Sequence, residues 1–175
     1  MLEIIKKEYF KIDVLINNAG IAKDQITDMK NANDFKEVLN TNLIGPFLTC
    51  KIIGKYMEEN EYGNIINISS TNGIDTYYPE GMDYDASKAG LNSLTMNFAT
   101  LYAPKIRVNA VAPGWIETEM NKDISEDFRK KEEEKILIER FANPKEIANV
   151  VYFLSQDEAS YINATIIRVD GGIKR

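Results

Sequence analysis

Tyr84 and Lys88 stand four residues apart in a run, YDASKAG, that favours a helix. Side chains at this spacing share one face of a helix. An ammonium beside a phenol favours the phenolate and so lowers the pKa of a group that ordinarily titrates near about 10. The chain contains no histidine, so a tuned pair of this kind is one way to transfer protons near neutral pH. The same spacing also occurs on exposed helix faces, and the pair gains meaning only from its neighbours.

Composition and charge narrow the class of protein. The 175 residues are 44% hydrophobic and 27% charged, which predicts one globular domain over residues 1–175. A net charge of -6 argues against nucleic acid and anionic membranes as partners. Residues 1–11 form a charged amphipathic segment without a cleavage signal, and no apolar run is long enough to span a membrane. A single cysteine, Cys50, fits a reducing compartment, where we expect it to be a small buried hydrophobe. These features predict a cytoplasmic protein, and no metal site is predicted.

Extended and helical patterns alternate along the chain. The apolar runs 12–16, 64–68, 106–112 and 165–169 predict strands. Helical periodicity covers 34–57, with an interruption at Gly45-Pro46, and also 85–102 and 144–154. Residues 116–135 are charged and lack a clean periodicity, as a mobile lid would.

This alternation predicts an α/β fold with a doubly wound, Rossmann-like parallel sheet, right-handed crossovers and helices on both faces. The polar run Ser69-Ser70-Thr71-Asn72-Gly73 follows the strand at 64–68. In open sheets of this kind, ligands bind at the carboxyl ends of the strands. The serine turn is therefore placed where a site is expected.

Several motifs, taken together and in order, resemble the short-chain dehydrogenase/reductase family, in its 3-oxoacyl-[acyl-carrier-protein] reductase subgroup. They are NNAG at 17–20, TNLIGPF at 41–47, the serine turn with Gly73, the Tyr84/Lys88 helix, 107–114 with Thr118, and VDGG at 169–172. The resemblance runs through essentially the whole chain. The joint match is far more specific than any single motif.

The resemblance implies roles for four catalytic residues. Tyr84 would protonate the forming alkoxide, and Ser70 would donate a hydrogen bond to the substrate oxygen. Lys88 would lower the pKa of Tyr84 and bind the ribose hydroxyls, while Asn42 would hold a water that links Lys88 to solvent. Alone, Ser70 would be read as a turn former and Asn42 as a solvated or capping helix residue.

The resemblance also implies a nicotinamide cofactor, NADP or NAD, with NADP slightly favoured. The residues expected to bind it are Asn18, Ala19, Gly20, Tyr84, Lys88, Pro113, Gly114, Ile116 and Thr118. The implied substrate is a small carbonyl compound or an acyl thioester of fatty acid biosynthesis. The implied assembly is a homo-oligomer, a homotetramer, that packs through the helices at 34–57 and 85–102. From the residues alone, Asn17 and Asn109 are expected to be structural, and Trp115 could equally face substrate or fill the core.

The front of the chain departs from the family pattern. None of the ten glycines forms the Thr-Gly-x-x-x-Gly-x-Gly turn that approaches the cofactor pyrophosphate. The resemblance begins before the fourth family strand, so the first three strands and the adenosine half of the cofactor site are lacking. The strand at 12–16 is then expected to be an open sheet edge. A fragment, a truncated gene product and a half completed by another chain all fit this sequence.

Two function classes follow. The first is an NAD(P)H-dependent oxidoreductase that interconverts a ketone and a secondary alcohol, with a 3-oxoacyl thioester as the favoured substrate. The second is a truncated, noncatalytic remnant or oligomerisation module of the same family. A sugar-nucleotide epimerase or dehydratase shares the Tyr/Lys pair but ranks lower, because the short C-terminal portion leaves no room for a nucleotide-sugar domain.

Overall fold

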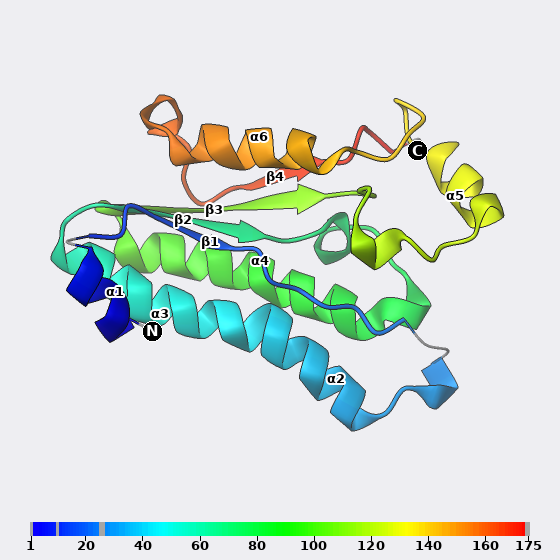
Figure 1. The fold of residues 1–175 in the computed structure, drawn as a ribbon, viewed down its shortest axis with the longest axis horizontal. Coiled ribbons are helices and arrows are strands. Elements are labelled where there is room, and N and C mark those ends of the chain that lie inside the picture. The colour runs from blue at the N-terminus through cyan, green and yellow to red at the C-terminus, as the bar shows by residue number, and fades with distance from the viewer. Residues whose placement is uncertain (1, 10, 25–26, 174–175) are drawn as a thin grey trace.

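A computed structural model describes residues 2–9, 11–24 and 27–173 of the chain (Figure 1). Its centre is a sheet of four parallel strands in the order β1-β2-β3-β4. The strands are β1 (Val14–Asn17), β2 (Gly63–Ile68), β3 (Ile106–Pro113) and β4 (Ile166–Val169). The predicted α/β class with a parallel, Rossmann-like sheet is confirmed.

Helices cover both faces of this sheet, as Figure 1 shows. The helices are α1 (Leu2–Glu8), α2 (Ala32–Leu39), α3 (Gly45–Glu59), α4 (Met82–Tyr102), α5 (Glu126–Glu133) and α6 (Pro144–Ser155). α3 and α4 lie on one face of the sheet and α6 lies on the other. The strand and helix positions expected from periodicity are therefore present, with boundaries shifted by a few residues.

Neighbouring residues of one strand point into two separate cores. Ile65 of β2 and Val108 of β3 pack with α3 and α4, whereas Ile66 and Val111 pack with α6. All four side chains are fully buried. A strand buried on both faces reads as a continuous apolar run, which explains why periodicity identified β2 and β3 so directly.

The crossover connections do not all have the same hand. Those through α3 and through α4 place their helices on one face, whereas the connection from β3 to β4 places α6 on the other. Since the strands follow one another in a single direction across the sheet, helices on opposite faces require opposite hands. The prediction of uniformly right-handed crossovers is thus wrong. The connection at 114–165 is long enough to pass over the carboxyl ends of the strands before it forms α6.

Two helical segments differ from the sequence expectation. The predicted break at Gly45-Pro46 is instead a π-helical turn, Asn40–Ile44, between α2 and α3, and Pro46 lies in the first turn of α3. There its missing N–H costs no helical hydrogen bond. Within the expected lid, α5 forms because Ser125 caps it, and none of its described residues is buried. A helix without a buried face leaves no apolar period in the sequence.

The β1 strand forms the open edge that the sequence predicts. In the described part of the chain it pairs with β2 alone, and Ile16 is 47% exposed. An edge of this kind presents unpaired backbone groups to any further strand. Across 2–9, 11–24 and 27–173, no helix is long and apolar enough to cross a membrane.

Candidate active site

The serine turn after β2, the first turns of α4 and the loops after β1 and β3 meet at the carboxyl edge of the sheet. Gly73 allows the serine turn to touch α4 directly. A Cβ at Gly73 would lie 2.6 Å from the Lys88 carbonyl carbon, so any side chain there would push the turn away from the helix. This contact brings Ser70 beside Tyr84.

The Ser70 hydroxyl approaches the Tyr84 phenol closely enough to lower the pKa of Tyr84. The Ser70 hydroxyl also caps its own turn, where it accepts a 3.2 Å hydrogen bond from the Asn72 N–H. Burial raises the pKa of Tyr84, Ser70 opposes the shift, and the charges of Asp24 and Asp85 add to it. The expected reduction of the phenol pKa by Lys88 is therefore not found in the chain by itself. Burial is the largest influence on this pKa, and Ser70 is the group that opposes it.

Lys88 lies on the same face of α4, with its ammonium nitrogen 5.4 Å from the centre of the Tyr84 ring. The residue is 3% exposed, and its Nζ donates a 2.8 Å hydrogen bond to the Ile68 carbonyl at the end of β2. Burial lowers the pKa of Lys88 to about 8. The group that is poised near neutral pH is thus the lysine and not the tyrosine.

Asp85 holds two neighbouring segments of the chain against the start of α4. One carboxylate oxygen accepts a 2.7 Å hydrogen bond from the Asn72 amide, and the other accepts a 2.9 Å bond from the Tyr78 N–H. The side chain between Tyr84 and Lys88 thus joins the serine turn to the loop that precedes α4. We call the group formed by Ser70, Tyr84 and Lys88 the Tyr84 corner.

Asn42, on the π-helical turn, is fully buried and committed to other protein groups. Its Oδ1 accepts from the Ile21 N–H at 2.9 Å, and its Nδ2 donates to the Ile21 carbonyl at 2.8 Å and to Ser87 Oγ at 3.1 Å. Both side-chain N–H groups are therefore used. The predicted water would have to be held by the Asn42 main chain or by the remaining lone pair of Oδ1.

The loop after β1 brings the first group of predicted cofactor residues to this edge. Asn18 and Ala19 are exposed, and Gly20 faces the Tyr84 corner. A Cβ at Gly20 would lie 3.5 Å from both Lys88 Nζ and Asn42 Oδ1. The backbone of Gly20 therefore covers the lysine ammonium.

The second predicted group follows β3. The Gly114 N–H donates to the Val169 carbonyl at 3.1 Å, and a Cβ at Gly114 would meet Asp170 at 2.9 Å. Ile116 bridges to Ala142, and Thr118 is exposed. Pro113 ends β3 at the same edge, so this second group follows the carboxyl end of β3.

Trp115 fills a small aromatic core beside the site. It stacks on Phe141 at 5.4 Å, meets Phe128 of α5 edge-on at 5.7 Å, and donates its N–H to Glu132. Phe128 also approaches Tyr78 at 6.5 Å. These contacts attach α5 to the loop that leads to Tyr84, and they favour the core-filling role over the substrate-facing one.

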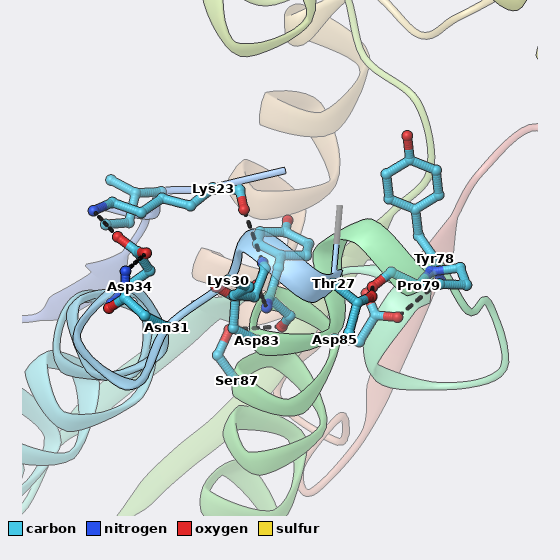
Figure 2. A network of polar contacts seen from close by, with 12 residues as sticks. Lys23, Thr27, Lys30, Asn31, Asp34, Tyr78, Pro79, Asp83, Asp85 and Ser87 are labelled. Carbon is cyan, nitrogen blue, oxygen red and sulfur yellow. Dashed lines mark hydrogen bonds and ion pairs between the residues drawn. The ribbon is translucent and has the colours of Figure 1, made fainter. Parts of the chain in front are cut away.

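Sequence reasoning missed the ion pair between Lys30 and Asp83. Its side chains are 4% and 0% exposed, and the two atoms are 2.5 Å apart. Figure 2 shows Lys30 reaching from the loop before α2 to Asp83, which also accepts a hydrogen bond from the Tyr84 N–H. A lysine in a polar loop reads as exposed, so no sequence signal pointed to it.

The comparisons with known proteins agree with this geometry. The family model described as enoyl-(acyl carrier protein) reductase matches residues 1–174. The 3-oxoacyl-[acyl-carrier-protein] reductase FabG of Thermotoga maritima is 40% identical over 174 residues, which cover 99% of this chain and 70% of that protein. The chain belongs to the short-chain dehydrogenase/reductase family. The predicted family is thus confirmed, and with it an oxidoreductase class.

Other similar proteins show the same partial coverage. FabG of Aquifex aeolicus is 43% identical over 163 residues, which cover 93% of this chain and 65% of that protein. A crystal structure of a short chain dehydrogenase from Bacillus anthracis has a TM-score of 0.87 at 36% identity, and the match covers 98% of this chain and 68% of that one. Gox2181 has a TM-score of 0.92 at 31% identity, with the same two coverages.

The residues present fit the nicotinamide half of a dinucleotide. The ammonium of Lys88 is buried under a glycine backbone, and in the described chain its one hydrogen-bond partner is the Ile68 carbonyl. Two donors remain for other acceptors, such as ribose hydroxyls. The glycine-rich turn that would hold the pyrophosphate does not occur in the sequence.

Proposed function

We propose that residues 1–175 are a single domain that forms the catalytic part of an NAD(P)H-dependent reductase, and that it converts a 3-oxoacyl thioester to the corresponding secondary alcohol. The observation that carries this proposal is the Tyr84 corner, in which a buried lysine, a phenol and a hydroxyl lie side by side. The names of the FabG relatives support the acyl-thioester substrate. A cytoplasmic location is proposed from the acidic charge and the buried thiol.

Ser70 and Tyr84 would act on the substrate oxygen. When bound, the nicotinamide supplies the hydride to the carbonyl carbon. The Ser70 hydroxyl donates a hydrogen bond to the oxygen, where negative charge grows, and so stabilises the transition state more than the ground state. Tyr84 gives its proton to this oxygen, because a phenol whose pKa is raised by burial holds its proton at neutral pH.

Lys88 would supply a positive charge beside Tyr84 and would exchange protons near neutral pH. With a pKa of about 8 it can lose or gain a proton near neutral pH. Its free donors are placed to bind ribose hydroxyls, and its charge stabilises the phenolate that Tyr84 becomes after proton transfer. Asn42 holds the Gly20–Ile21 segment against Lys88, and a water on its main chain would return the proton.

The cofactor residues would form a rim around this corner. Asn18, Ala19 and Gly20 would line one side with backbone and small side chains, and Pro113, Gly114, Ile116 and Thr118 would line the other. NADP is slightly preferred over NAD, on the resemblance to the FabG relatives. The described chain contributes no residue to the adenosine end that would decide this preference.

A fluorescence titration tests the proposal most directly. The chain contains one tryptophan, Trp115, and it lies beside the site. We expect NADPH to quench its emission by energy transfer, with saturation. NADH is run in parallel, and a Gly20→Leu variant, which fills the space over Lys88, is the matched control. Reduction of a 3-oxoacyl thioester is then assayed, and a folded chain without saturable binding would contradict activity of these 175 residues.

A second role, as an assembly module, is supported by apolar side chains exposed on the helices that the family resemblance assigns to subunit contacts. On α3, Phe47, Leu48 and Ile52 are 39%, 46% and 44% exposed, and on α4, Leu101 is 63% exposed. Monomers rarely expose clusters of this kind. Sedimentation should give a dimer or tetramer that dissociates in Leu48→Lys, and a monomer at high concentration would contradict this role.

A further inference from the structure

The buried pair of Lys30 and Asp83 lies one peptide away from the reacting tyrosine. Asp83 Oδ1 accepts a 2.5 Å hydrogen bond from Lys30 Nζ and a 2.9 Å hydrogen bond from the Tyr84 N–H. Its other oxygen, Oδ2, is buried and has no hydrogen-bond partner in the described chain. A buried carboxylate is costly without a counter-charge. The first turn of α4 therefore depends on the position of Lys30.

The same lysine holds the loop that follows β1. Lys30 Nζ donates a 2.8 Å hydrogen bond to the Lys23 carbonyl. The Lys23 ammonium in turn pairs with Asp34 and Glu37 of α2. Figure 2 shows this path, from α2 through Lys23 and Lys30 to the start of α4. Lys30 is thus the point at which the loop and the helix that carries Tyr84 are joined.

That loop is also the cover of the lysine ammonium. Gly20 lies over Lys88 Nζ, and Ile21 is fixed to Asn42 by two hydrogen bonds. Burial is the cause that lowers the pKa of Lys88 to about 8. If the loop lifted, water would reach the ammonium and its pKa would return toward the ordinary value of 10.5.

We propose that Lys30 is a positioning residue, which holds the loop 18–23 over the Lys88 ammonium. Its buried pair with Asp83 fixes this loop relative to Tyr84. The catalytic meaning of this role rests on the reductase function proposed above. The geometry itself can be tested without turnover or cofactor.

Other charges surround the start of α4 and must be considered in the test. Asp24 interacts electrostatically with Lys30, Asp83, Asp85 and Glu80. Removal of Lys30 therefore changes the local charge as well as the loop contact. A variant that removes both members of the ion pair separates these effects, because it leaves the net charge unchanged.

The test is an NMR titration of the 175-residue chain labelled with 13C at lysine Cε. The Lys88 resonance is assigned by its loss in Lys88→Met. In Lys30→Met and in the double variant Lys30→Met/Asp83→Asn, we expect the Lys88 midpoint to rise by about one pH unit or more, toward the value of an exposed lysine. Lys36→Met is the matched control, since Lys36 lines the same cavity of about 400 Å³ as Lys30. It should leave the midpoint unchanged.

The double variant decides the test if Lys30→Met alone does not fold, because it buries no unpaired charge. A Lys88 midpoint that stays near 8 in a folded double variant would overturn the proposal. A general loss of stability would not move the midpoint of the folded state. A shifted midpoint in a chain that reduces no thioester would support the positioning role while the reductase function fails, and thioester reduction with an unshifted midpoint would do the reverse.

Discussion

The Tyr84 corner and the β1 edge meet at Gly20, but they are held by different kinds of contact. The corner is built on α4 and β2, whose buried side chains pack from both faces of the sheet. The edge strand pairs on one side alone within the described chain, and the residues that follow it, Asn18 and Ala19, are exposed. The proton-transfer groups are therefore supported by the interior, whereas the first group of predicted cofactor residues, 18–20, follows an edge strand.

A few buried polar contacts compensate for this difference. Asn17 donates to Asn67 on β2 at 2.8 Å, and Asn67 donates to Thr95 of α4 at 2.9 Å. Asn42 holds Ile21, and Lys30 holds the Lys23 carbonyl. Directional hydrogen bonds set the position of the edge where apolar packing is thin. We therefore expect changes in the corner to remove chemistry and changes along the edge to remove local order.

The largest effect is expected in the corner itself. In a chain completed with a cofactor half, Tyr84→Phe should lower kcat by about 1,000-fold, because the proton donor is lost. The phenyl ring still fills the same space, so the Kd for cofactor should change little. Steady-state kinetics with a 3-oxoacyl thioester, together with a cofactor titration, provide both values. Undiminished turnover in this variant would defeat the mechanism.

Along the edge, the largest loss of stability is expected where Asn17, Asn67 and Thr95 are joined by hydrogen bonds. Asn67→Ala removes the partners of Asn17 and Thr95 from a fully buried position. We expect the free energy of unfolding to fall by about 3 kcal/mol, since buried donors and acceptors are left unsatisfied. Asn60→Ala is the control, because Asn60 is exposed at the end of α3. Urea unfolding compares the two, and equal losses would show that these hydrogen bonds add nothing.

The buried lysine of the corner predicts a dependence of stability on pH. Lys88 loses its proton near pH 8 when folded and near 10.5 when unfolded. Between these values the unfolded state binds more protons, so stability rises with pH relative to Lys88→Met. The difference in the free energy of unfolding should grow by about 2 kcal/mol from pH 8 to 10. Urea unfolding of both proteins is measured at each pH. A difference in the free energy of unfolding that does not change with pH would refute this prediction.

The smallest effect is expected in the rate at which a thiol reagent labels Cys50, which depends on local opening of the β1 edge. Burial raises the pKa of the Cys50 thiol to about 12, and the Asn17 amide donates to its sulfur at 3.3 Å. Labelling by a thiol reagent therefore requires local opening. Asn17→Ala should speed the labelling of the folded chain by about 10-fold, while Asn60→Ala should not. A labelling rate unaffected by Asn17→Ala would mean that α3 and the edge open together with the whole fold.

Much of this molecule could be predicted from local patterns. β2 and β3 are continuous apolar runs because both of their faces are buried. Several predicted site residues come together at the carboxyl ends of the strands, since parallel strands share that edge: Gly20, Asn42, Ser70, Tyr84 and Lys88. The sequence did not predict α5 within the expected mobile lid at 116–135, because a helix with no buried face has no apolar period.

Electrostatics was predicted less well. The expected low pKa of Tyr84 depended on the nearness of Lys88, whereas the phenol is buried and its pKa is raised. The lysine lies over the face of the Tyr84 ring. Burial lowers the pKa of the lysine itself. Spacing along a helix fixes which side chains are neighbours, but the depth to which each is buried depends on what covers the helix.

The sequence by itself determined the alternation of strands and helices, the family motifs and the types of residue available for proton transfer, because these are local or collinear properties. Tertiary structure alone decided that Lys30 pairs with Asp83 across 53 positions, that Gly20 covers Lys88, and that α6 lies on the face opposite α3 and α4. Such contacts join segments that are distant in the chain, and their energies depend on the burial that only the assembled fold creates.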